Sequence, residues 1–190
     1  MKKLLTYVAG KVSPDSVFGR HDWRDEFCAE LTRMTGFEII NLDPIKGRGD
    51  FGLNENDSKL VFGRDCYMIR SADLVIVNLT DDISVGGSIE MLVTKHYHKP
   101  LIGIARQEGK FRKAKKEIRG RVFENYTDPF VATVCDSLVG NIQEAATWIK
   151  HYVANPVPIK DLSILSQALE YYKKEFYDAD EIVQDCEKRV

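Results

Sequence analysis

The stretch LVIVNL, Leu74 to Leu79, is the clearest strand in the sequence. Its four consecutive aliphatic residues, with no polar interruption, are typical of a strand buried on both faces, as in a parallel sheet. A helical pattern over 59–72 precedes this strand, and Gly86-Gly87 introduce a second helix that runs to about residue 96. A buried strand between two helices predicts the repeating unit of an α/β fold.

The alternation of strands and helices continues along the chain on both sides of this stretch. Further strands are expected at 4–9, 37–42, 101–104 and around 130–134, and further helices at 23–34 and 142–153. Short connections between alternating strands and helices imply a parallel sheet with helices on both faces. We therefore predict a doubly wound α/β domain of flavodoxin-like architecture, with about five strands, over residues 1–153.

Residues 154–190 are expected to form a linker and a C-terminal appendage. Pro156 and Pro158 mark the linker. Beyond it, apolar residues recur at spacings of three and four: Leu162, Leu165, Leu169, Tyr172 and Phe176. This spacing predicts an amphipathic helix of five or six turns, which packs either on its own domain or on a second subunit.

Composition excludes several classes of protein. The 190 residues include 27 Lys or Arg and 29 Asp or Glu, and 44% are hydrophobic, so the chain as a whole is not disordered. A net charge of −2 argues against binding nucleic acid through a dominant basic face. The apolar runs are strand-sized, so no membrane span is expected. The N-terminus begins like a signal peptide, but its apolar run ends at Gly10-Lys11 and no small-residue cleavage site follows, so we expect a cytoplasmic protein.

One segment, 106–121, is strongly basic. It contains eight Lys or Arg residues, two Glu and a single aromatic residue, Phe111. A platform for stacking nucleic-acid bases would need more aromatic side chains. We expect a solvated loop or helix that steers an anionic substrate toward the site.

The cysteines and histidines give no sign of a metal site. No two of the four cysteines form a CxxC pair, and we interpret them as buried, reduced thiols. The four histidines do not cluster with carboxylates in the sequence. We expect no metal and no cofactor.

The candidate site lies where such sheets bind ligands, at the carboxyl ends of the strands. Tyr7 is at the end of the first predicted strand, and Asp65 is in the helix before the 74–79 strand. The segment SVGGSIE, Ser84 to Glu90, leads from the loop after that strand into the next helix. Glycines at a helix N-terminus let a ligand approach the backbone and offer amides to an anion or a hydroxyl.

Each of the two carboxylates also has a purely structural interpretation. We place Glu90 in the first turn of its helix, where the helix dipole stabilises any glutamate. Asp65 has apolar neighbours and also fits a solvated residue at the edge of a buried helix face. Brought to one pocket, two carboxylates can divide the roles of nucleophile and acid.

Four blocks of the sequence together resemble the nucleoside 2-deoxyribosyltransferase family in order and spacing, over about residues 4–153. The blocks are Tyr7-Val8-Ala9-Gly10, Arg64 to Leu79, Ser84-x-Gly86-x-x-x-Glu90 and His98-Lys99-Pro100-Leu101-Ile102. Each block alone is a weak signal, whereas the ordered set is fairly specific.

The resemblance implies an activity: cleavage or transfer of the N-glycosidic bond of 2′-deoxynucleosides. In that family, the residue matching Glu90 attacks the anomeric carbon and forms a covalent glycosyl-enzyme. The residue matching Asp65 manages the proton on the departing base, and the residue matching Tyr7 orients the nucleophile. Gly10, Gly86 and Gly87 are expected to line the substrate. The resemblance also implies a homo-oligomer, since a neighbouring subunit completes the site in this family.

One departure from the family pattern leaves the substrate open. The transferases usually carry Asp where this chain has Ser84, and the related 5′-monophosphate N-glycosidases carry Ser there, whose hydroxyl helps to bind phosphate. Arg20 could add a phosphate ligand. Asp128 roughly matches a residue donated by the neighbouring subunit, and it would repel a phosphate. We favour a nucleoside substrate, with monophosphate hydrolysis as the alternative and a non-catalytic nucleoside- or nucleotide-binding module as the alternative of another class.

Overall fold

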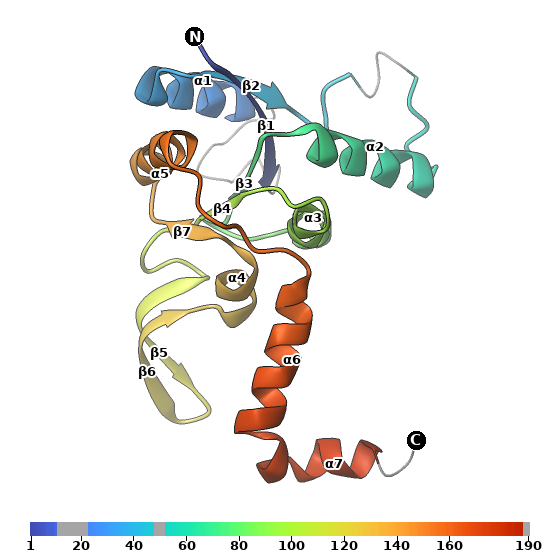
Figure 1. Ribbon diagram of the computed structural model, residues 1–190, viewed down its shortest axis with the longest axis vertical. Coiled ribbons are helices and arrows are strands. Elements are labelled where there is room, and N and C mark those ends of the chain that lie inside the picture. The colour runs from blue at the N-terminus through green and yellow to red at the C-terminus, as the bar shows by residue number, and fades with distance from the viewer. Residues whose placement is uncertain (11–22, 48–51, 188–190) are drawn as a thin grey trace.

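The computed structural model describes residues 1–10, 23–47 and 52–187, and it shows a central sheet with helices on both faces (Figure 1). The strands are β1 (Lys3–Gly10), β2 (Glu38–Leu42), β3 (Leu74–Asn78), β4 (Leu101–Ile104), β5 (Arg112–Ile118), β6 (Arg121–Thr127) and β7 (Ser137–Val139). The helices are α1 (Trp23–Thr35), α2 (Ser58–Ser71), α3 (Val85–His96), α4 (Pro129–Val134), α5 (Ile142–Ala154), α6 (Ser163–Glu175), the 3-10 helix η1 (Tyr177–Ala179) and α7 (Glu181–Glu187). None of the helices in these described ranges is long and apolar enough to span a membrane.

The main sheet has five strands in the order β2-β1-β3-β4-β7, and every neighbouring pair is parallel. Counted along the chain within this sheet, the order is 2-1-3-4-5, which is the flavodoxin-like arrangement. The predicted doubly wound fold is therefore confirmed. The strand order reverses between β1 and β3, and in such sheets the ligand binds at this switch point.

The two faces of the sheet bury different side chains of β1. Leu4 and Val8 pack in the core beneath α1 and α5, whereas Tyr7 and Ala9 pack in the core beneath α2 and α3. This division follows from the alternation of side chains along a strand. The odd-numbered position of Tyr7 thus directs its ring toward the helices that carry Asp65 and Glu90.

A buried ion pair anchors the linker that follows α5. The ammonium of Lys95 contacts the carboxylate of Asp136, and the two side chains are 0% and 6% exposed. Asp136 also accepts hydrogen bonds from Leu101 N and Lys160 N, at 2.7 Å each. The Lys160 ammonium then donates to Cys135 O at 2.6 Å. These contacts fix the position at which the chain leaves the sheet for α6.

The predicted strand around 130–134 is wrong, because Pro129–Val134 forms the helix α4. The Asp128 carboxylate caps this helix by accepting from Phe130 N at 3.1 Å and Val131 N at 3.2 Å. Proline at the first helical position is favoured because its ring presets the helical φ and the missing N–H would lack a helical partner. The strand on this side of the sheet is instead β7, three residues further along the chain.

The basic segment is also different from the expectation of a loop or helix. Strands β5 and β6 form an antiparallel hairpin whose two-residue turn, Arg119-Gly120, has positive φ at both positions. Such turns match the twist of the flanking strands. Two further bases, Arg106 and Lys110, form ion pairs at 3.4 and 2.5 Å with Asp81 and Asp82, in the loop that leads into α3.

The C-terminal helix is shorter than the predicted five or six turns. Helix α6 has 13 residues and ends at Glu175, and η1 and α7 follow at an angle to it (Figure 1). Asp180 accepts from Val183 N at 3.2 Å and so begins a new helix, which explains the break. Together these elements project away from the sheet on the same side as the hairpin.

All four cysteines are free, but only Cys28 and Cys135 are buried. Cys66 is partly exposed and Cys186 is exposed, so the expectation of buried thiols holds for half of them. Burial raises the pKa of both the Cys28 and the Cys135 thiol to about 12.

Candidate active site

The centre of the site is a hydrogen bond between β1 and α3. The hydroxyl of Tyr7, which is fully buried, donates to Glu90 Oε1 at 2.8 Å. Burial raises the pKa of the Tyr7 hydroxyl, and the negative charges of Glu90 and Asp65 raise it further. Tyr7 therefore remains a protonated donor that holds one carboxylate oxygen of Glu90 in place.

Glu90 is the sixth residue of α3, so our placement of it in the first helical turn is wrong; no acidic residue occupies that turn. The helix-dipole explanation for this glutamate loses its force, because the effect is confined to the first turn. Glu90 is only partly exposed and is bonded to a buried hydroxyl 83 residues away in the sequence. Such a long-range contact is made by the fold and not by the helix.

Asp65 lies on α2, on the same side of the sheet as Glu90 (Figure 1). It is partly buried, and its charge acts on the Tyr7 hydroxyl. Asp65 and Glu90 both act on the thiol of Cys66 and raise its pKa, after the larger effect of burial. The two carboxylates and Tyr7 thus form one electrostatic cluster. Two carboxylates on opposite faces of the sheet would not form such a cluster.

The start of α3 is built by Ser84 and the two glycines. The Ser84 hydroxyl caps the helix by accepting from Gly87 N at 3.1 Å. Gly87 is buried, and a Cβ there would lie 2.9 Å from Ile83 Cγ1. Gly86 is exposed, and a Cβ there would meet only the Ser84 hydroxyl oxygen, at 3.8 Å. Packing therefore accounts for Gly87, whereas Gly86 leaves open space beside the helix N-terminus.

Gly10 and Asn78 lie opposite each other at the carboxyl ends of β1 and β3. Gly10 has φ +148°, and a Cβ there would lie 2.9 Å from Asn78 Cβ. The Asn78 side-chain oxygen accepts from the backbone N–H and the hydroxyl of Thr80, at 3.1 and 2.7 Å. The two strand ends approach closely at the switch point, and Asn78 fixes the start of the loop that carries Ser84.

Sequence reasoning missed one residue of this region, Arg24 in the first turn of α1. It is 2% exposed, and its guanidinium donates to Val8 O at 2.8 Å and Gly10 O at 2.9 Å. Burial lowers the pKa of Arg24, whereas the charges of Asp43 and Glu90 oppose this shift. Arg24 places a positive charge beneath the end of β1 and holds that end in position.

A signal for Arg24 was present in the helical period. Its spacing from Phe27, Cys28 and Leu31 puts it on the buried face of α1. A charged residue on such a face is rarely buried without a specific role.

Two of the predicted binding residues are not placed with this cluster. Arg20 lies outside the described residues. Asp128 caps α4 and lines a different, largely apolar cavity between α3, α4 and α6.

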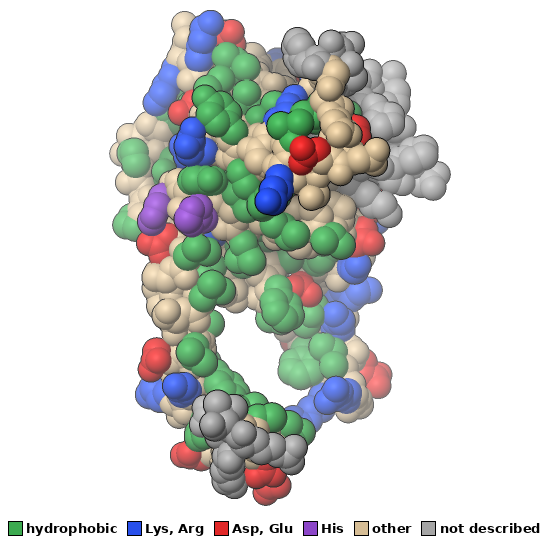
Figure 2. Space-filling view, turned by 90° about the vertical axis from the view of Figure 1, so that its right-hand side faces the viewer, with side chains coloured by type: hydrophobic (Ala, Val, Ile, Leu, Met, Phe, Trp, Pro, Cys, Tyr) green, Lys and Arg blue, Asp and Glu red, His purple; other side chains and the backbone are tan. Residues whose placement is uncertain are grey.

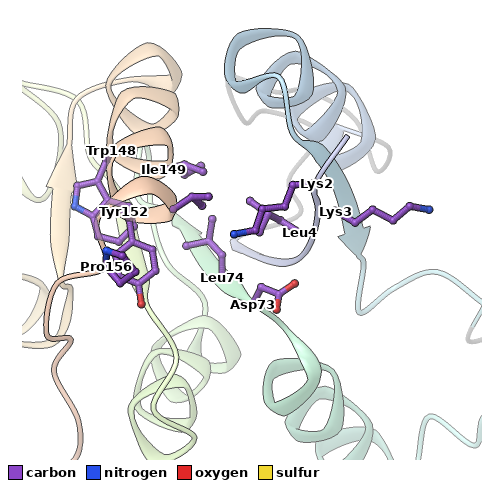
Figure 3. Close-up of a pocket in the computed structure, with 10 residues that line it drawn as sticks. Lys2, Lys3, Leu4, Asp73, Leu74, Trp148, Ile149, Tyr152 and Pro156 are labelled. Carbon is purple, nitrogen blue, oxygen red and sulfur yellow. The ribbon is translucent and has the colours of Figure 1, made fainter.

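A further pocket, of about 240 Å³, lies at the amino-terminal ends of β1 and β3 (Figure 3). It is lined by Trp148 and Tyr152 of α5 and by Lys2 and Asp73, which precede β1 and β3. Because the catalytic candidates lie at the carboxyl ends of the same strands, this pocket is separate from them. Within the described ranges, no group of three or more His, Cys, Asp or Glu side chains is arranged to hold a metal ion.

Comparison with known proteins gives matches only among solved structures, since no protein-family model and no curated protein matches the chain. A conserved protein from Enterococcus faecalis V583 is 16% identical, with a TM-score of 0.55, over 80% of this chain and 98% of its own. At this identity the likeness establishes a shared fold.

Two enzymes are also among the structural neighbours. A 2-deoxyribosyltransferase from Bacillus psychrosaccharolyticus is 15% identical with a TM-score of 0.46, over 83% of this chain and 98% of its own. The CMP N-glycosidase BcmB of Clostridium botulinum is 15% identical with a TM-score of 0.38, over 78% of this chain and 99% of its own. These scores are lower, so the activity of this chain has to be argued from its own site.

Proposed function

We propose that this protein cleaves or transfers the N-glycosidic bond of a 2′-deoxynucleoside through a covalent deoxyribosyl ester on Glu90. The observation that supports this most directly is the 2.8 Å bond from the buried Tyr7 hydroxyl to Glu90, with Asp65 in the same electrostatic cluster. All three residues belong to the sequence blocks that resemble the nucleoside 2-deoxyribosyltransferase family. Two carboxylates and one hydroxyl are sufficient for this chemistry, so the proposal requires no cofactor.

In the first step, a carboxylate oxygen of Glu90 forms a bond to C1′ of the sugar while the bond from C1′ to the base nitrogen breaks. The electron pair of that bond goes to the base, which takes a proton from Asp65. A neutral base is a poor leaving group, and a positioned acid contributes a factor of ~10²–10⁴ to such a step. Tyr7 fixes the orientation of the attacking carboxylate.

In the second step, a nitrogen of an incoming base or the oxygen of water attacks C1′ and displaces Glu90. The Asp65 carboxylate accepts the proton that the incoming group loses. Attack by a base makes the protein a transferase, and attack by water makes it a hydrolase. We favour transfer between bases.

Ser84 supports a second candidate, hydrolysis of deoxynucleoside 5′-monophosphates. Its hydroxyl lies at the N-terminus of α3, next to the open space at Gly86. Helix N-termini bind phosphate through free amides and the helix dipole, and a serine brings no negative charge that would repel it. This candidate uses the same Glu90 chemistry with a different group at the sugar 5′ position.

The test is a substrate panel: deoxyadenosine and deoxycytidine monophosphate, each with and without a free acceptor base, followed by chromatography of the products. Base exchange that requires an acceptor identifies a transferase, and release of base without an acceptor identifies a hydrolase. Glu90→Gln should lower turnover by at least roughly 10⁴-fold while the protein stays folded. Glu30→Gln, the same change on the surface of α1, should leave turnover unchanged.

A second measurement follows the intermediate itself. Acid-quenched wild-type protein should carry one deoxyribosyl group on the peptide that contains Glu90, and Glu90→Gln should carry none. If the wild type turns over no nucleoside or nucleotide while Glu90→Gln binds these ligands normally, the pocket belongs to a non-catalytic binding module and the proposal fails.

A further inference from the structure

The C-terminal arm, residues 163–187, has an apolar stripe that the other described residues leave largely exposed. Only Ile164 of α6 is buried, whereas Leu165, Leu169 and Phe176 are 57%, 50% and 57% exposed. A helix of 13 residues is marginally stable in water on its own, and most helices in proteins are stabilised by packing of their apolar face. We therefore expect another apolar surface to cover this stripe.

One residue of this stripe, Leu165, also lines the largely apolar cavity between α3, α4 and α6. This cavity has a volume of about 710 Å³, and its lining also includes Met91 of α3 and Val131 of α4. Phe130, at its edge, is 82% exposed. An exposed aromatic side chain beside an apolar hollow is typical of a protein–protein contact.

The net charges of two segments of this chain indicate what covers the apolar stripe. The β5–β6 hairpin, residues 112–127, has six Lys or Arg and two Glu, a net charge of +4. The arm has seven Asp or Glu and two Lys, a net charge of −5. Hairpin and arm are thus complementary, and both belong to this chain.

Within one chain, the charged side chains described in the hairpin and in the arm do not pair with each other. Hairpin and arm make up the lower part of the molecule in Figure 1, and Figure 2 shows an open gap there, with hydrophobic side chains around it. Across the described ranges no ion pair joins the hairpin to the arm; Lys115 pairs with Glu124 inside the hairpin, and Lys174 with Glu175 inside the arm. The bonds of Lys160 to Asp136 and Cys135 fix the base of the arm.

We propose that two copies of this chain form a two-fold symmetric dimer in which the arm of each copy packs on the cavity and the hairpin of the other. The two α6 stripes then cover each other, and each acidic arm meets a basic hairpin. Every copy has both surfaces, so the two contacts of the dimer are equivalent. Two copies therefore satisfy each other's surfaces, and the assembly closes at a dimer. This dimer does not depend on the proposed activity and is tested without it.

The first experiment is sedimentation velocity on the full chain. The wild type should sediment with about twice the 21.7 kDa mass of one chain. Raising the salt concentration from about 0.05 M to about 0.5 M should weaken the dimer about tenfold, because exposed ion pairs are screened. Leu165→Gln combined with Leu169→Gln should give monomers, whereas Leu60→Gln, at a similarly exposed leucine of α2, should leave the dimer intact.

A charge exchange then tests which surfaces meet. One variant carries Lys116→Glu and Arg121→Glu in the hairpin, and the other carries Glu170→Lys and Asp178→Lys in the arm. Each variant alone should dimerise more weakly than the wild type, because the changes take the hairpin from +4 to 0 or the arm from −5 to −1 and so remove most of the attraction at both contacts. An equimolar mixture should associate more tightly than either variant, because one of its two contacts then joins the native hairpin (+4) to the native arm (−5).

The control is Lys150→Glu on the exposed surface of α5, which should not affect association. Circular dichroism of every variant shows whether the fold is kept. A monomeric wild type overturns the proposal, as does an oligomer that survives the leucine changes or a mixture that associates no better than its components.

Discussion

Replacing Asp136 by leucine should cost more stability than any other single change at the buried ion pair. The substitution leaves the fully buried Lys95 ammonium with the carbonyl of Lys99, at 3.2 Å, as its remaining hydrogen-bond acceptor among the described residues. Breaking a buried pair by removal of one partner costs about 3–5 kcal/mol. Leu101 N and Lys160 N also lose their acceptor, which moves the expected loss toward the upper end of that range. For a chain of this length, Tm should fall by about 6–20 °C.

The reciprocal change, Lys95→Met, should cost less. The Asp136 carboxylate then keeps both of its backbone donors, so the loss is about one charge-assisted hydrogen bond, or about 1.5–3 kcal/mol. The double variant should be more stable than Asp136→Leu alone, because it contains no unpaired buried charge. The structure thus predicts an order of stability as well as a magnitude.

The effect should also depend on pH. Burial lowers the pKa of Lys95, and the bond and charge of Asp136 oppose that shift. Because the pKa is lower in the folded state than in the unfolded state, the unfolded state binds more protons between the two values, and stability rises with pH in that window. Without Asp136 the opposing attraction is lost, so the rise toward the ordinary lysine pKa, about 10.4, should be steeper in Asp136→Leu than in the wild type.

Urea unfolding followed by circular dichroism, at about pH 7 and about pH 9.5, measures these differences. A loss of unfolding free energy below about 1 kcal/mol for Asp136→Leu would refute the reasoning, since a buried unpaired charge should destabilise the fold by more than that. A larger loss for Lys95→Met than for Asp136→Leu would refute the assignment of the backbone donors.

Three further outcomes are expected. Gly10→Ala should destabilise the protein by about 1–3 kcal/mol in urea unfolding, because its φ of +148° and its close approach to β3 both exclude a Cβ. Ser84→Ala should lose about 1 kcal/mol through the missing cap of α3, whereas Ser84→Thr should keep most of it; equal losses would contradict the capping role. At about pH 8, iodoacetamide should label exposed Cys186 well before Cys28 and Cys135, whose pKa values burial raises to about 12, and peptide mass spectrometry gives the order.

The fold was predictable where hydrophobic pattern and spacing agree. The buried run at 74–79 and the helical periods around it gave the α/β sheet, and the sheet places Tyr7 and Glu90 at one edge. The two glycines indicate approximately where α3 begins, but they do not indicate its first residue. For that reason Glu90 was misplaced by one helical turn.

The errors have local physical causes. The run of small and apolar residues at 130–134 is too short for periodicity to separate a strand from a helix, and the Asp-Pro capping signal before it decides the matter. The β5–β6 hairpin lacks the alternation of a half-buried strand, because both of its faces are largely exposed. The buried charge of Arg24 depends on the carbonyls at the end of β1, which only the folded chain brings to it.

The anchor at Lys160 has a consequence for engineering the protein. Lys95, which binds Asp136, is five residues beyond Glu90 on the same helix, α3, or about 7.5 Å along its axis. A truncation at residue 154 would therefore remove a donor from a carboxylate that supports α3, the helix that carries Glu90. A shortened chain that ends at residue 161 or later should keep this donor, so a truncation there should preserve the contact between Lys160 and Asp136.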